Sequence, residues 1–248
     1  MLSVPRVARK LSISGYMHVV IRGNGKQIIF EDAADYRRFL STIDRFCRET
    51  EVKICAYCLM ENHAHLLIRD EKQMVSRFMQ KVGVSYSMYF NRKYERTGHL
   101  LQERFFSECV EEETYFLVVL RYILNNPQKA GICETSKYRW SSYALYDHPE
   151  PFMDLSLIKK LLGDKANYEA FVNKPGDDDC TEYDMYVKDD AWAKYMIRKC
   201  LNVDSGTALQ AFERKKRNEA LRILKDNGLT HRQIERLTGI SKSVVQRA

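Results

Sequence analysis

The chain has 248 residues, 45% of them hydrophobic and 29% charged, which is typical of a folded protein with one sizeable core and room for a second, smaller domain. No apolar run approaches the ~20 residues that a membrane-spanning helix needs. The basic segment 1–15 lacks the apolar stretch of a signal peptide. The seven cysteines are scattered and odd in number, which indicates a reducing compartment. We therefore expect a cytoplasmic protein with no membrane partner.

The net charge of +7 is unevenly distributed along the chain. Residues 206–248 carry +6, residues 151–205 carry −3 and residues 1–150 carry +4. A basic block that follows an acidic segment predicts either an appendage that contacts nucleic-acid phosphates or a solvated helical face. Charge alone does not decide between these two interpretations.

Hydrophobic periodicity predicts an alternation of strands and helices over the first half of the chain. The expected strands are 16–22, 52–60, 63–69 and 102–110, and the expected helices are 32–50, 72–94 and 111–126. Only Glu61 and Asn62 separate the second strand from the third, which favours an antiparallel hairpin. Pro127 ends the last helix. The order predicts an α+β fold, an α/β sandwich built on a mainly antiparallel sheet.

Prolines, a glycine and a run of three aspartates lie within residues 147–184. This composition is typical of a linker, and the pattern from about residue 185 onward is helical again. We therefore expect a first domain over residues 1–150, a linker over 151–184 and a small helical domain over 185–248.

Cys55 and Cys58 form a CxxC pair inside an expected strand. Their three-residue spacing places them on opposite faces of a strand, and no second CxxC follows. We therefore expect core cysteines and not a zinc or redox site.

His63 and His65 lie at the start of the third expected strand. The period of two places both imidazoles on one face, roughly 7 Å apart along the chain. Histidines at this spacing can converge on one divalent ion, and they can equally be ordinary residues at the end of a hairpin.

Tyr122 and Asn126 are four residues apart on the expected helix 111–126, so they share a face. A tyrosine has a pKa of about 10 and is a weak nucleophile at neutral pH. A metal that polarises a phosphate would assist it, so a hydroxyl beside a metal-binding amide suits phosphoryl transfer. Packing in the core is the alternative role for Tyr122, and Tyr115 on nearly the same face is a rival nucleophile.

Four stretches of the sequence, in order over about residues 14–146, resemble the single-tyrosine HUH transposases, and most of all the REP-associated tyrosine transposases. They are GYMHVVIRGNGKQIIF, AYCLMENHAHLLI, YFNRKYERTGHLLQERF and RYILNNPQKAG. The resemblance implies a ferredoxin-like or RRM-like HUH nuclease domain in which His63 and His65 bind Mg²⁺ or Mn²⁺. It also implies that Tyr122 is the nucleophile and that Asn126 completes the metal site, and it gives Tyr115 no role.

The sequence departs from that family in three respects. Glu61 stands where the family often has proline, Ala64 is small for the hydrophobic position, and the C-terminal segments extend beyond the minimal family domain. None of these differences affects a residue with an implied ligand role.

Three further sets of residues are candidates for contacts with the site or with DNA. His18 either packs in the core or takes part in the site. Gln102 and Arg104, with Phe105 and Phe106, are candidates to hold phosphates and to stack on unpaired bases. Core packing is the alternative role for at least one phenylalanine, since the two alternate faces.

Residues 229–248 have the pattern of a helix-turn-helix. Thr230 and Gln233 form a capping-box pattern, Gly239 suits the turn and Ser241 can cap the second helix. The segment from about residue 185 resembles the DNA-binding domain of DnaA-type initiators. Such a domain would contact duplex DNA, and the candidate phosphate contacts are Arg232, Lys242 and Arg247.

The predicted function is that of a metal-dependent tyrosine transposase or nuclease, associated with the nucleoid. It would cleave and rejoin single-stranded hairpin DNA through a 5′-phosphotyrosine intermediate, as a monomer or homodimer. The alternatives are a non-cleaving DNA-binding regulator derived from a transposase and a replication-initiator-type nicking enzyme.

Overall fold

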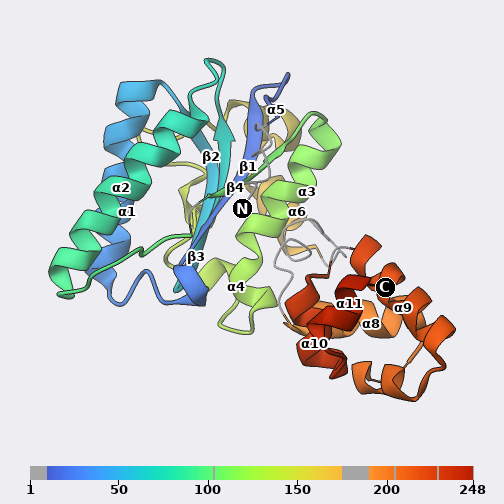
Figure 1. Cartoon of the computed structure of the whole chain (residues 1–248). Helices are drawn as coiled ribbons and strands as arrows, with labels where there is room; N and C mark the ends of the chain where they lie inside the picture. The colour runs from blue at the N-terminus through green and yellow to red at the C-terminus, as the bar shows by residue number, and fades with distance from the viewer. Residues whose placement is uncertain (1–9, 103, 175–189, 204, 228, 248) are drawn as a thin grey trace. The chain divides into compact units, whose positions relative to one another are not determined.

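Four antiparallel strands form the sheet at the centre of the fold (Figure 1). They are β1 (Tyr16–Arg22), β2 (Lys53–Met60), β3 (His63–Arg69) and β4 (Phe106–Cys109), in the spatial order β2-β3-β1-β4. The β-α-β-β-α-β chain order with this strand order is the ferredoxin-like topology. The predicted α+β sandwich on an antiparallel sheet is therefore confirmed.

This computed structural model describes residues 10–102, 104–174, 190–203, 205–227 and 229–247. The chain divides into two compact units, Met1–Asp179 and Cys180–Ala248. Among the described residues, every helix is too short or too polar to cross a lipid bilayer.

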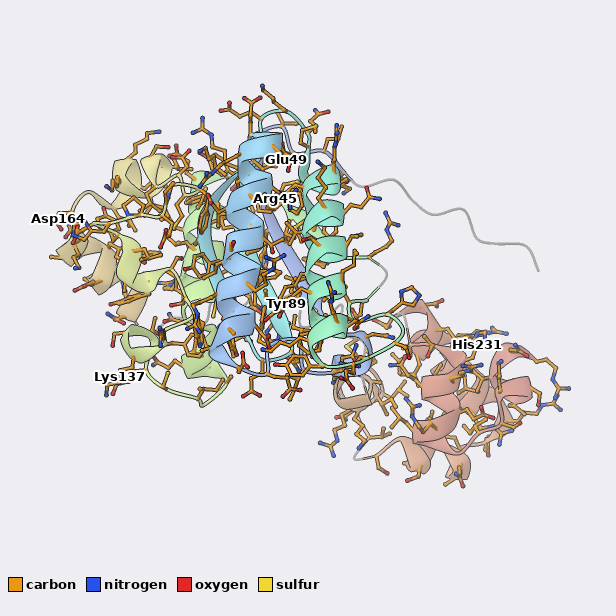
Figure 2. All side chains as sticks on the ribbon, turned by 90° about the vertical axis from the view of Figure 1, so that its left-hand side faces the viewer. Arg45, Glu49, Tyr89, Lys137, Asp164 and His231 are labelled. Atoms are coloured by element: carbon orange, nitrogen blue, oxygen red, sulfur yellow. The ribbon has the colours of Figure 1, made fainter. Side chains whose placement is uncertain are left out.

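Helices α1 (Ala33–Thr50) and α2 (Val75–Lys93) lie side by side over one face of the sheet (Figure 2). Their inward residues, among them Phe39, Phe78 and Tyr86, pack against the odd-numbered residues of β1 to form the main core. Both helices have well-formed N-termini. Asp32 makes the capping box of α1, and the Asp70 carboxylate accepts hydrogen bonds from two backbone N–H groups at the start of α2.

Helix α3 (Glu113–Leu124) covers the opposite face of the sheet, where it contacts β2 and β3. The predicted helix over 111–126 ends two residues early, because Asn125 takes φ −86° and ψ 2°. A separate turn, α4 (Asn126–Lys129), follows with Pro127 in its first turn, where the missing N–H of proline has no cost. Asn126 thus begins a new helical turn one turn beyond Tyr122.

The predicted strand over 102–110 is shorter than expected, since β4 pairs with β1 only through Phe106–Cys109. Both cysteines of the CxxC pair are buried and free, as predicted.

The described part of the predicted linker is folded onto the first unit. Residues 151–174 contain α5 (Ser156–Leu162) and α6 (Lys165–Asn173), and residues 175–184 lie outside the described residues. Ile158, Tyr168 and Val172 are buried, and the ring of Tyr168 stacks on Tyr146 with centroids 4.5 Å apart. The prediction of a linker over residues 151–174 differs from this arrangement. The prolines at 149 and 151 are typical of a linker, although a helical pattern follows them.

Short 3₁₀ turns complete the first unit: η1 (Asn24–Lys26), η2 (Thr135–Lys137) and η3 (Tyr143–Leu145). The second unit contains α8 (Asp190–Leu201), η4 (Gly206–Ala211), α9 (Arg214–Asp226), α10 (His231–Thr238) and α11 (Lys242–Arg247). These helices share a core of their own that includes Leu221, Leu224 and Ile234. The capping box between Thr230 and Gln233 is present, and Gly239 ends α10 with φ 72°. The last two helices and the turn between them match the sequence prediction.

Candidate active site

The register of the two central strands brings three histidines to one face of the sheet. In the β1–β3 pairing, Arg22 lies opposite His63, Val20 opposite His65 and His18 opposite Leu67. Directly opposed residues of an antiparallel pair project to the same face, and the period of two extends that face along each strand. His18 therefore shares the face of His63 and His65, beneath α3.

His18 forms a hydrogen bond with His65. The Nε2 atom of His18 lies 3.1 Å from the Nδ1 atom of His65, and the two rings stack with an interplanar angle of 20°. Both residues are almost fully buried. The contact fixes the orientation of the His65 ring, so His18 is a supporting residue of the site as well as a packing residue.

His63 is oriented by its sequence neighbour. Its Nδ1 atom lies 2.6 Å from the Oδ1 atom of Asn62, an oxygen that can only accept a hydrogen bond. In this orientation Nδ1 of His63 donates to Asn62, and Nε2 is the nitrogen that would bind a metal ion.

The site keeps all three imidazoles neutral. Burial lowers the pKa of His18 to about 3. Burial is also the main cause that lowers the pKa of His63 to about 4, and the charge of Arg22 lowers it further. The pKa of His65 lies well below its ordinary value because of burial and then of the neighbouring histidines. Neutral imidazole is the form that binds metals.

Tyr122, in the last turn of α3, packs over these histidines. Its ring centroid lies 5.4 Å from that of His65 and 5.9 Å from that of His18, both in edge-to-face geometry. The side chain of Asn126 forms a hydrogen bond with His63. The structure thus brings together His63, His65, Tyr122 and Asn126, the four residues that the sequence singled out.

Tyr122 is only 5% exposed, and the Nζ atom of Lys129 lies 5.0 Å from its ring centroid. A DNA phosphate can reach the hydroxyl only if neighbouring side chains move. Tyr115 lies near the other end of α3. Its neighbour Phe116 packs on Tyr16 with ring centroids 5.1 Å apart, at the end of β1 remote from His63.

The donor set is suited to a divalent ion. His63 and His65, with ring centroids 4.9 Å apart, offer two imidazole nitrogens, and Asn126 offers an amide oxygen. Within the described part of the chain, no group of three or more histidine, cysteine or acidic residues could hold a metal ion. The three candidate ligands, His63, His65 and Asn126, are uncharged side chains.

Gln102 and Arg104 belong to the segment between α2 and β4. Both are exposed and line a hollow of about 610 Å³ together with Arg22, residues of α2 and residues 98–101 and 105. The backbone N–H of Gln102 donates to the carbonyl of Arg22, which ties this segment to β1. The DNA contacts of Gln102 and Arg104 stay a prediction. Contacts made within this hollow would lie beside α2.

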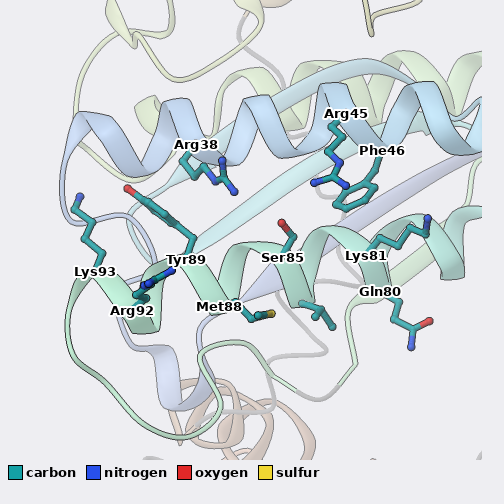
Figure 3. A pocket seen from close by; sticks show the side chains of 11 residues that line it. Arg38, Arg45, Phe46, Gln80, Lys81, Ser85, Met88, Tyr89, Arg92 and Lys93 are labelled. Carbon is teal, nitrogen blue, oxygen red and sulfur yellow. The ribbon is translucent and has the colours of Figure 1, made fainter.

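A second hollow, of about 790 Å³, lies between α1 and α2 and is lined by several cations (Figure 3). Its aromatic rings are covered: Arg38 lies over Tyr89, and both Arg45 and Lys81 lie over Phe46. Each of these two rings thus has at least one cation over it.

Arg232, Lys242 and Arg247 are exposed on α10 and α11 in the second unit. The backbone N–H of Lys242 donates to the Glu235 carboxylate across the turn, which fixes the start of α11. The three cations are accessible, and their DNA contacts stay a prediction.

The first unit is thus an α+β domain in which a histidine pair on a central strand faces a tyrosine on a helix. Residues 12–126 match the family model described as IS200-like transposases. This part of the chain is therefore similar to that family of transposases.

Two solved structures show similarity to the chain. One is a REP-associated tyrosine transposase bound to a REP hairpin, with 16% identity and a TM-score of 0.48 over 56% of this chain and 84% of that chain. The other, from Deinococcus radiodurans R1 and assigned as a transposase, has 13% identity and a TM-score of 0.33 over 54% of this chain and 99% of that chain. No curated protein matches the chain significantly.

Proposed function

We propose that the chain cleaves and rejoins single-stranded DNA, at or beside hairpins, through a covalent bond to Tyr122. The observation that carries the proposal is the packing of the Tyr122 ring on His65, beside the hydrogen-bonded pair of His63 and Asn126. A nucleophile placed next to a set of neutral metal ligands is the arrangement that phosphoryl transfer requires. The IS200-like family supports DNA as the substrate.

In this reaction the Tyr122 oxygen attacks a backbone phosphorus, and the bond from phosphorus to the 3′ oxygen breaks. The strand then carries a 5′-phosphotyrosine, and the other end leaves as a 3′-hydroxyl. A later attack by a 3′-hydroxyl on the phosphotyrosine reverses these bonds and rejoins DNA without an external energy source.

The residues around Tyr122 divide the remaining tasks. His63, His65 and Asn126 would hold Mn²⁺ or Mg²⁺, which supplies Lewis-acid polarisation of the phosphate. Asn62 and His18 orient the two imidazoles through the hydrogen bonds to their Nδ1 atoms. The Nζ atom of Lys129 lies over the tyrosine ring, which places a positive charge beside the nucleophile.

We also propose that the second unit contacts duplex DNA through α10 and α11, with Arg232, Lys242 and Arg247 on phosphates. The exposed cations and the two short helices joined at Gly239 support this role. A non-cleaving regulator would use the same unit, and a replication-initiator enzyme would use the same chemistry.

The nucleophile is tested by trapping the covalent adduct. The chain is incubated with Mn²⁺ and a pool of hairpin oligonucleotides with random single-stranded flanks, then resolved by denaturing gel and peptide mass spectrometry. Tyr122→Phe keeps the ring and loses the hydroxyl, so we expect no adduct, with the fold intact.

Tyr115→Phe is the matched control, since it removes a tyrosine hydroxyl from another position of the same helix. We expect it to form the adduct at the wild-type level. An adduct on Tyr115, or one that persists in Tyr122→Phe, would refute the assignment. A wild-type chain that binds the DNA but forms no adduct would favour the regulator.

A further inference from the structure

Arg22 is the last residue of β1 and lies beside the candidate metal ligands. It stands directly opposite His63 in the β1–β3 register. Opposed residues of an antiparallel pair have Cβ atoms roughly 5 Å apart and project to the same face. The side chain of Arg22 therefore leaves the backbone next to His63, on the face that carries Tyr122.

The backbone around Arg22 is held on both sides. The N–H of Gly23 donates to the carbonyl of Asn62 over 2.9 Å, and the carbonyl of Arg22 accepts from the N–H of Gln102 over 2.9 Å. A Cβ atom at Gly23 would come within 2.0 Å of the Gln27 carbonyl oxygen, so only glycine fits there. The guanidinium is thus attached to a rigid point beside the site.

The guanidinium has unused hydrogen-bonding capacity. The Nε atom of Arg22 is buried and has no hydrogen-bond partner. Over the residues that the structure describes, no carboxylate forms an ion pair with Arg22. Buried donors without a partner are uncommon in native proteins and need an explanation such as a ligand.

The site around Arg22 carries a positive charge that favours an anion. His63 and His65 are neutral, Asn126 is uncharged, and the charge of Arg22 contributes to lowering the pKa of both histidines. A divalent ion bound to the three ligands would be repelled by the guanidinium, and a phosphate between them would be attracted by both. Arginine also matches the geometry of phosphate oxygens with parallel N–H donors.

We propose that Arg22 binds a non-bridging oxygen of the phosphate that Tyr122 attacks, and that it disfavours metal binding while no DNA is present. The inference rests on the proposed function and adds a residue to it. A bound phosphate thereby favours metal binding, because its negative charge offsets the repulsion between the guanidinium and the metal ion.

The test measures two affinities on which Arg22 acts in opposite directions. In a Tyr122→Phe background, the affinity for a pool of flanked hairpin oligonucleotides is measured in EDTA, and the affinity for Mn²⁺ is measured by calorimetry without DNA. Arg22→Gln should bind the DNA about tenfold more weakly, as expected for loss of a charged hydrogen bond. It should bind Mn²⁺ alone more tightly, by roughly threefold or more, as a nearby positive charge is removed.

Two control variants accompany Arg22→Gln. Arg22→Lys keeps the charge and loses the parallel N–H donors, so its Mn²⁺ affinity should stay near the wild-type value and its DNA affinity should fall between those of the wild type and Arg22→Gln. Arg38→Gln removes an exposed cation on α1 and should leave the Mn²⁺ affinity unchanged. A purely structural role predicts that Arg22→Gln weakens both affinities together, and that outcome overturns the proposal.

The proposal and the proposed function fail in different ways. An adduct in the wild-type chain, combined with unchanged DNA affinity in Arg22→Gln, overturns the role of Arg22 and leaves the reaction standing. A wild-type chain that neither binds Mn²⁺ nor forms an adduct overturns the reaction, and the role of Arg22 with it.

Discussion

The buried histidines make the stability of the first unit depend on pH, and His18 allows this to be measured. Its pKa is lowered from an ordinary value of 6.5 to about 3 by burial. As the pH falls below 6.5, the unfolded chain takes up a proton at His18 and the folded chain does not. Stability is therefore lost on acidification, by about 1.4 kcal/mol for each pH unit below 6.5. Between pH 6.5 and pH 5 this amounts to about 1.7 kcal/mol from His18 alone.

The assay is urea unfolding at several pH values between 7 and 4.5, in EDTA so that no metal protects the imidazoles. The chain has two tryptophans, and Trp192→Phe leaves Trp140 as a fluorescence reporter within the first unit. His18→Leu should reduce the slope of the free energy of unfolding against pH by about 1.4 kcal/mol per unit between pH 5.5 and 4.5. An unchanged slope would show that His18 titrates alike in the folded and unfolded chains, and would refute the reasoning.

Two further predictions concern helix α2 and the second unit. Asp70→Ala removes the acceptor for two N–H groups of α2 and should lower the free energy of unfolding by about 1–2 kcal/mol in the same urea assay. Asp44→Ala, which breaks only an exposed ion pair, should cost less than about 0.5 kcal/mol; equal losses would contradict the capping role. Changing Arg232, Lys242 and Arg247 together to glutamine should reduce the slope of log affinity for duplex DNA against log salt by about 2–3. An unchanged slope would mean that these cations do not contact phosphate.

The sequence predicts the central fold well because its elements are strongly periodic. Helix α1 starts within a residue of the expected boundary, since Asp32 both caps it and precedes its apolar stripe. The hairpin of β2 and β3 follows from two apolar runs that are separated by only two polar residues. The weakest predictions concern β4 and residues 151–174. The strand and the helices there are short, and linker-like residues such as proline lie next to helical patterns.

Only part of the candidate site can be predicted from the sequence. His63 and His65 are visible as a same-face pair, and Tyr122 with Asn126 as a helical spacing. His18 is visible only as a residue that either packs in the core or takes part in the site, and Arg22 is not visible at all, because their positions depend on the register between β1 and β3. A shift of one residue would turn both side chains to the other face of the sheet. Period-two spacing shows that His18 and Arg22 share a face, but the sequence does not show which residues lie opposite them.

The two halves of the site are held by different parts of the fold. The histidines lie on a strand that is hydrogen-bonded along both edges, to β1 and to β2. Asn126 depends on the break at Asn125, whose side chain donates to the carbonyl of Val172 in α6 over 2.8 Å and accepts from Thr135 in η2. Residues beyond 150 therefore fix the point where the chain turns from Tyr122 to Asn126. A chain that ended at residue 150 would retain every predicted ligand and the nucleophile, yet it would lose the hydrogen bond from Asn125 to Val172, at the residue between α3 and α4.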